Sequence, residues 1–89
     1  MTDSSYPELG GKRKLDVRPW NVREGDIIEF YGLVLGDSSL MLVTERPTKS
    51  RFRYRVAVRE IRRIGNGHSP RNPDHTAWYS NDTVEVYRD

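Results

Sequence analysis

Eight basic side chains crowd into residues 46–63, where the only acid is Glu60. The preceding stretch, residues 24–45, carries five acids and no base, so a formal charge of +2 conceals a strongly polarised chain. Guanidinium and ammonium groups bind phosphate and carboxylate, and a polarised field influences which partners approach. The basic segment is therefore the candidate binding site. Its basic residues are Arg46, Lys49, Arg51, Arg53, Arg55, Arg59, Arg62 and Arg63.

Residues 51–58 alternate between basic and apolar side chains, which is typical of a strand with two unlike faces. One parity holds Phe52, Tyr54, Val56 and Val58, and the other holds Arg51, Arg53 and Arg55. Side chains two apart on a strand lie roughly 6.6 Å apart on one face, so the pattern predicts a row of guanidinium groups. A nucleic-acid backbone opposite this row would satisfy its charge. Basic residues 12–14 would add to it, and Tyr31, Tyr79 or Trp78, if exposed, would supply stacking surfaces.

Three other interpretations of the arginine row stay open. Cross-strand pairing with Glu29 and Glu45 of the neighbouring acidic segment would neutralise it. The row also fits an acidic surface on a larger protein, or the acidic segment of a second copy of the chain. Arg59, Arg62 and Arg63 follow the row and either extend it into a stripe or stay in solvent.

The sequence predicts no enzymatic activity, cofactor or metal. His68, Asp74 and His75 share one segment, but their spacing matches no recognised ligand set and the chain has no cysteine. No phosphate-binding glycine motif or nucleophile motif is present. The large side chains Trp20, Trp78, Phe30 and Phe52 are expected in the core.

The elements that position the basic row are predicted strands. Residues 26–35 and 40–45 are rich in β-branched and apolar side chains and form a predicted hairpin around a turn at 36–39. Residues 46–50 are a predicted turn because they contain Pro47. The three-residue spacing of Ile61 and Ile64 predicts one helical turn. Residues 65–75 are a predicted loop, followed by short strands at 76–79 and 83–87.

These elements predict a mainly β fold, a small antiparallel barrel of about five strands with one short helical turn. The pattern V-x-x-G-D-x-I, residues 22–28, resembles the opening strand of SH3-like barrels. Ile61-Arg62-Arg63-Ile64 is similar to the short helical turn that such barrels place before their last strand. The resemblance implies a small SH3-like barrel and carries no functional residues, since these barrels host many activities.

Residues 1–14 hold few large apolar groups and are expected to form a flexible tail, with a single domain at 15–89. The chain lacks a predicted membrane span or signal peptide, so we expect a cytoplasmic monomer or weak homo-oligomer without a membrane partner. The function that the sequence favours is a non-enzymatic module that contacts nucleic-acid phosphates through its arginine-rich strand. The alternative is a small accessory or regulatory protein, for example of a phage or mobile element, that docks onto an acidic protein surface.

Overall fold

A computed structural model describes residues 6–31, 38–64 and 73–89, which form seven strands and two 3-10 turns. The turns are η2 (Pro7–Leu9) and η3 (Pro19–Asn21), and no α-helix occurs within these ranges. Neither turn is long and apolar enough to cross a membrane. The strands are β1 (Arg13–Val17), β2 (Ile27–Tyr31), β3 (Ser38–Val43), β4 (Thr48–Ser50), β5 (Arg53–Ile64), β6 (Asp74–Tyr79) and β7 (Val84–Arg88).

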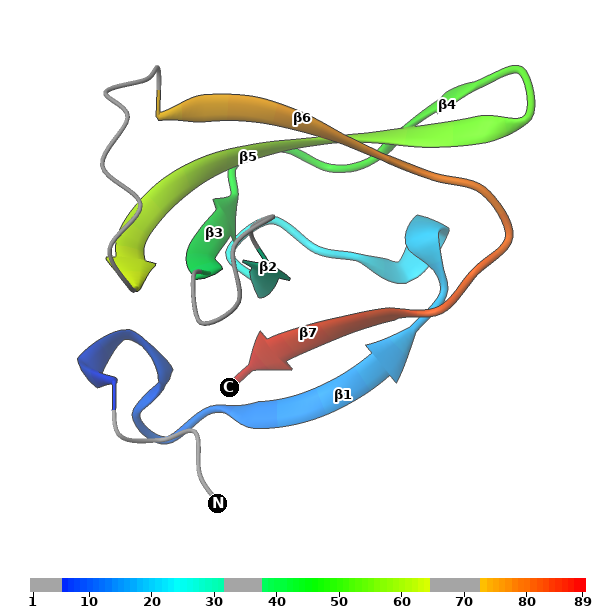
Figure 1. Cartoon of the computed structure of the whole chain (residues 1–89). Coiled ribbons are helices and arrows are strands. Elements are labelled where there is room, and N and C mark those ends of the chain that lie inside the picture. Colours follow the sequence, from blue (N-terminus) through cyan, green and yellow to red (C-terminus); the bar gives the residue numbers. More distant parts are fainter. Residues whose placement is uncertain (1–5, 32–37, 65–72) are drawn as a thin grey trace.

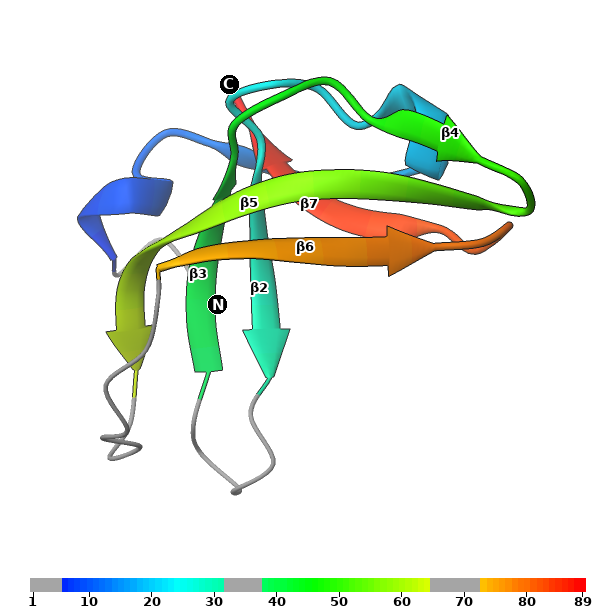
Figure 2. The ribbon, with the colours of Figure 1, turned by 90° about the horizontal axis from the view of Figure 1, so that it is seen from above.

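The strands form one antiparallel sheet in the order β1-β7-β2-β3-β5-β4, with β6 paired to the opposite edge of β5. Figure 1 shows this sheet curling into an open half-barrel, in which β5 and β6 face β7 and β1 across the interior. Seen from above, β2 and β3 run across β5 (Figure 2). The mainly β prediction is confirmed, with two more strands than the five expected.

The predicted hairpin is confirmed as β2 and β3, which pair from Ile27 opposite Leu42 to Tyr31 opposite Ser38. Its turn lies outside the described residues. The predicted turn at 46–50 is partly wrong, because β4 begins at Thr48, directly after Pro47. A proline before the first residue of an edge strand removes no ladder hydrogen bond, so the strand can start there.

The interior of the half-barrel is an apolar cluster that joins its two facing layers. Val56 and Val58 of β5 pack with Val86 of β7, and all three are almost fully buried. Val43 of β3 and Val22, which follows η3, complete the same cluster. Burial of this apolar surface holds the curled sheet together.

A second apolar cluster lies on the opposite face of β2 and β3, and it corrects the prediction of a flexible tail for residues 6–14, the part of that segment that the structure describes. Ile27 and Leu40 belong to it, together with Tyr87 and Leu9 of η2, which is 2% exposed. Arg13 and Lys14 of the expected tail lie in β1 and pair with β7. Both faces of β2 and β3 carry apolar side chains that must be covered. Leu9 covers part of the second face, and its burial anchors the segment to the sheet.

The predicted helical turn at Ile61–Ile64 is wrong, because β5 continues as a strand to Ile64. Leu40 pairs with Arg62 while Met41 pairs with Glu60, so Ile61 is the extra residue of a β-bulge. A bulge shifts the alternation of a strand by one residue. Ile61 and Ile64 therefore both pack against the second cluster although they are three positions apart.

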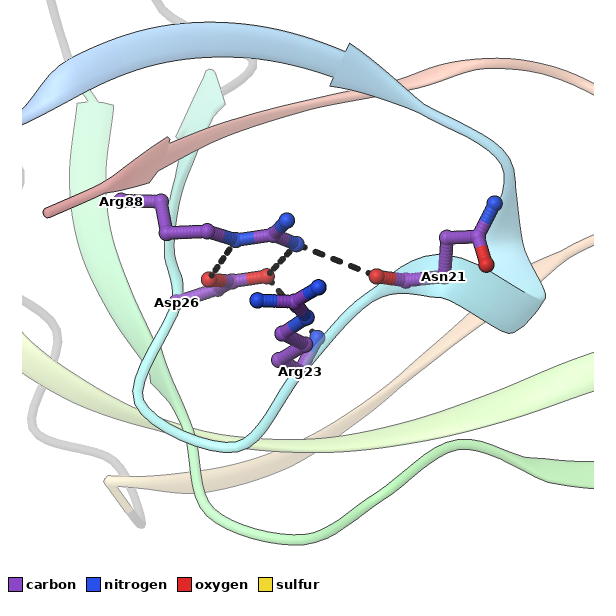
Figure 3. A network of polar contacts seen from close by, with 4 residues as sticks. All are labelled: Asn21, Arg23, Asp26 and Arg88. Atoms are coloured by element: carbon purple, nitrogen blue, oxygen red, sulfur yellow. Dashed lines mark hydrogen bonds and ion pairs between the residues drawn. The ribbon is translucent and has the colours of Figure 1, made fainter.

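A buried ion pair links the end of β7 to the turn before β2 (Figure 3). Arg88 donates to both carboxylate oxygens of Asp26, from Nε at 2.9 Å and from Nη2 at 2.8 Å. The carboxylate also accepts from the Arg23 backbone N–H, and Arg88 Nη2 donates to the Asn21 carbonyl. The hydrogen bond to Asp26 raises the pKa of the Arg88 guanidinium, which therefore stays charged. Gly25, at φ +96°, makes the tight turn that directs Asp26 inward.

Candidate functional site

The structure divides the basic segment into two groups with different surroundings. Arg59, Arg62 and Arg63 lie in the second half of β5, whereas the other basic residues lie in β4, in the first half of β5 or beside them. Figure 2 shows the β4–β5 hairpin projecting sideways from β2 and β3, crosswise to these two strands.

Each arginine of the second half of β5 contacts a carboxylate. Arg59 donates from Nε and Nη2 to Asp74 of β6, at 2.8 and 3.3 Å. Arg63 Nε donates to Glu60 at 3.0 Å. These contacts neutralise this part of the segment, so the predicted stripe does not continue along β5 as a free cationic surface.

Arg62 Nε donates at 2.7 Å to Glu8 of η2, and its guanidinium group also lies over the ring of Tyr6. The hydrogen bond with Arg62 is the main cause that lowers the pKa of Glu8, and the same bond raises the pKa of Arg62. Glu8 thus neutralises Arg62 from a segment that the sequence pattern assigned to a flexible tail.

The alternative in which Glu29 and Glu45 neutralise the arginine row does not hold within the described residues. Glu29 accepts a hydrogen bond from the Ser38 hydroxyl at 3.2 Å, and neither glutamate forms an ion pair with a described arginine. The described acids that pair with arginines of the basic segment are Glu8, Glu60 and Asp74. The arginines in the first half of β5 therefore have no carboxylate partner in the part of the chain that the structure describes.

Arg53 and Arg55 lie on one face of β5 with Trp78 of β6, and we call these three residues the arginine–tryptophan face. Arg55 is the register partner of Trp78, and the Arg53 guanidinium carbon lies 4.4 Å from the Trp78 ring centroid. Trp78 is still 44% exposed. Neither arginine has a carboxylate within 4 Å among the described residues. The predicted row is confirmed for these two arginines, and a stacking ring lies beside them.

The hairpin tip differs from the prediction, because β5 begins at Arg53 rather than at Arg51. Ser50 pairs with Arg53, so Arg51 and Phe52 form a two-residue turn. Arg51 has φ +51°, and Phe52 is 88% exposed. The prediction that Phe52 lies in the core is wrong because the tip extends beyond the apolar interior. Trp20 and Trp78, also expected in the core, are about half exposed, at 48% and 44%. Phe30 is partly buried and packs against the interior apolar cluster.

Lys49 and Arg46 do not belong to the arginine–tryptophan face. Lys49 pairs with Tyr54, whose side chain lies on the opposite face of β5 from Arg53 and Arg55. Arg46 lines a groove of about 660 Å³ with Trp20 and Arg23. These two bases contribute to the field around the hairpin but not to its row.

A second groove, of about 510 Å³, begins at Arg55 and follows β5 and β6 toward Arg59. Glu45 and Asp74 line it, together with Thr44 and Thr76. Arg55 and Arg59 line the same groove, so its two acids are matched by two bases. The groove therefore lacks the excess of basic side chains that an anion site needs.

The candidate acid–base residues are not assembled into one site. Asp74 and His75 lie in β6 rather than in the predicted loop, and successive strand residues project to opposite faces. Asp74 binds Arg59, and the buried Nε2 atom of His75 has no hydrogen-bond partner in the described structure. His68 lies outside the described residues. Those residues contain no cluster of three or more side chains suited to a metal ion.

No protein-family model matches this chain, and no curated protein or solved structure gives a significant match. Function is therefore argued from the site itself.

Proposed function

We propose that this protein is a non-enzymatic binding module that holds nucleic-acid phosphates on its arginine–tryptophan face. The observation that carries the proposal is that Arg53 and Arg55 lie side by side on one face of β5. Neither guanidinium group has a carboxylate partner among the described residues. Like charges two residues apart repel each other, and an anion between them turns that repulsion into attraction. Guanidinium forks match phosphate oxygens in a bidentate geometry.

The exposed ring of Trp78 favours nucleic acid over an acidic protein surface. An acidic surface would need only the guanidinium groups, whereas a nucleic acid also presents bases that stack on an aromatic ring. The Arg53 guanidinium, which lies over Trp78, is itself a flat surface on which a base stacks. Phosphate contacts of this kind position the ligand without reading its sequence, so binding is expected to be weakly sequence-specific.

Binding at several salt concentrations tests the proposal. With Arg53 and Arg55 each on one phosphate, the slope of log K against log salt is expected to lie at about −1.4 to −1.8. Fluorescence anisotropy of labelled oligonucleotides measures it. R53Q and R55Q should each weaken binding and reduce the magnitude of the slope by about 0.7–0.9.

R13Q is the matched control, because Arg13 is an exposed arginine on β1 and loses the same charge away from the hairpin. It should leave the slope unchanged. Absence of binding to any oligonucleotide at low salt would overturn the proposal. Equal losses for R13Q and R53Q would show that only net charge matters, and would also contradict it.

We also propose that the half-barrel is related to SH3-like barrels. The support is the turn at Gly25 and Asp26, which begins β2 at the position where the V-x-x-G-D-x-I pattern places the opening strand. The second part of the resemblance does not support it, because Ile61 and Ile64 belong to a bulged strand rather than to a helical turn.

A further inference from the structure

The hairpin tip has two local features that are energetically unfavourable in the protein without a ligand. Phe52 is 88% exposed, the most exposed large apolar side chain among the described residues. Arg51 adopts φ +51° in the two-residue turn, a conformation that costs non-glycine residues about 1–2 kcal/mol. An aromatic ring held in water between two arginines is a surface without a partner. Backbone strain of this kind is found at ligand-binding sites, and here it lies next to the exposed ring and to Arg53 of the arginine–tryptophan face.

The width of the sheet behind the tip argues against insertion into a DNA duplex. Tyr54 pairs with Lys49 of β4 on one side and with Tyr79 of β6 on the other, so the hairpin is three strands wide almost to its tip. Three strands span about 10 Å between the outer backbones alone, and their side chains add to this width. A major groove about 12 Å wide admits a two-stranded ribbon or a helix. A three-stranded sheet with side chains does not fit it.

Aromatic rings on an open sheet face need bases whose faces are accessible. In a duplex the base faces are stacked on one another, and separating them costs a few kcal/mol per step. In a single strand they are free to stack on protein rings. Phe52 precedes Arg53 in the chain at the tip, and the centroid of the Trp78 ring lies 4.4 Å from the Arg53 guanidinium carbon. The end of the hairpin thus carries two aromatic rings close to Arg53 and Arg55, so bases and phosphates of one strand can be bound together.

We infer that the ligand of this face is single-stranded nucleic acid, with bases stacked on Phe52 and on the Arg53 guanidinium that lies over Trp78, and with phosphates bound by the donor edges of Arg53 and Arg55. This inference rests on the proposed function and narrows it to one class of nucleic acid. Phe52 acts at the tip as a second stacking surface.

Binding of an oligo-dT of about 15 nucleotides, within the site sizes known for single-strand binders, is compared with binding of a duplex of the same length. The wild-type protein should bind the single strand more tightly. F52A and W78A should each weaken that binding by about 5- to 150-fold, and neither should change the salt slope, because the phosphate contacts remain. Y31A is the matched control, since Tyr31 is a 75% exposed ring on β2, away from the hairpin. It should change neither affinity.

Tryptophan fluorescence gives an independent readout, because the chain has only two tryptophans. In W20F the remaining emission comes from Trp78, and it should be quenched when the single strand binds. F52A should fold normally because its ring contributes to neither apolar cluster. Equal or tighter duplex binding, together with unchanged single-strand affinity in F52A, would overturn the inference and leave the proposed function standing. Failure of the wild-type protein to bind either oligonucleotide would overturn the proposed function itself.

Discussion

Replacing Arg88 by methionine is expected to bring the protein close to unfolding. The substitution keeps the apolar stem of the side chain but removes both bonds to Asp26, whose side chain is only 2% exposed. The carboxylate then keeps one hydrogen bond, from the Arg23 backbone N–H. Removing one partner of a buried ion pair costs about 3–5 kcal/mol of folding stability. We expect about 3 kcal/mol here, because the Arg88 side chain is 18% exposed and the pair is not fully shielded from water.

This loss is large beside the stability of a chain of this length, about 4–13 kcal/mol. Urea unfolding followed by circular dichroism measures it. With a slope of about 1 kcal/mol per molar urea, the midpoint of R88M should fall by about 3 M. R13M is the control, because Arg13 is the register partner of Arg88 on β1 and is exposed. It should change the free energy of unfolding by less than about 0.5 kcal/mol.

The double variant D26N/R88M separates the cost of a stranded charge from the loss of contacts. Neutralising the carboxylate should recover part of the stability lost in R88M, with a coupling free energy of about 1–3 kcal/mol. A loss below about 1 kcal/mol for R88M, the value typical of an exposed pair, would refute the reasoning. So would an effect of D26N that simply adds to that of R88M.

Three other substitutions test separate parts of the structure. R51G should raise the free energy of unfolding by about 0.5–1 kcal/mol in urea melts, because glycine adopts a positive φ freely; a destabilised R51G would contradict the turn geometry. L9A should lower it by about 2–5 kcal/mol, because Leu9 is buried in the second cluster, whereas an unchanged melt would show that η2 is not docked. The pKa of Glu8 is lowered in the folded state, so its pairing with Arg62 stabilises the protein above the usual glutamate pKa and this stability is lost as the pH falls through the folded value. Thermal melts between pH 3 and pH 7 should therefore depend less on pH in E8Q, and an unchanged dependence would exclude the Glu8–Arg62 pair as its source.

Local patterns predicted the elements that short-range physics controls. Alternation of apolar and polar residues located β5 from Arg53 to Val58, and the apolar runs around a turn located the β2–β3 hairpin. The pattern failed at Ile61, because a bulge adds a residue to a strand without changing its composition. It also failed at Phe52, where side-chain type indicated burial but the hairpin extends past the interior.

The fate of the arginine charges depended on contacts that are distant along the chain. Arg62 forms an ion pair with Glu8, which is 54 positions away in the chain, and Arg59 forms one with Asp74 of the neighbouring strand β6. Only the Arg63–Glu60 pair is local in sequence among these contacts, and the acids of the preceding segment, Glu29 and Glu45, form no ion pair with a described arginine. Sheet order decides which carboxylate comes within reach of which guanidinium, and no local signal carries that order.

By itself, the sequence determined a small β domain with an arginine row on one strand, because strand periodicity is a local property of the backbone. Only the tertiary structure decided which of the described arginines pair with a carboxylate and which aromatic rings stay exposed. The curled sheet brings Glu8 and Asp74 to one half of β5 and brings Trp78 beside the other half. The physical reason is that electrostatic pairing acts over a few ångströms in space, and folding sets those distances between residues far apart in the chain.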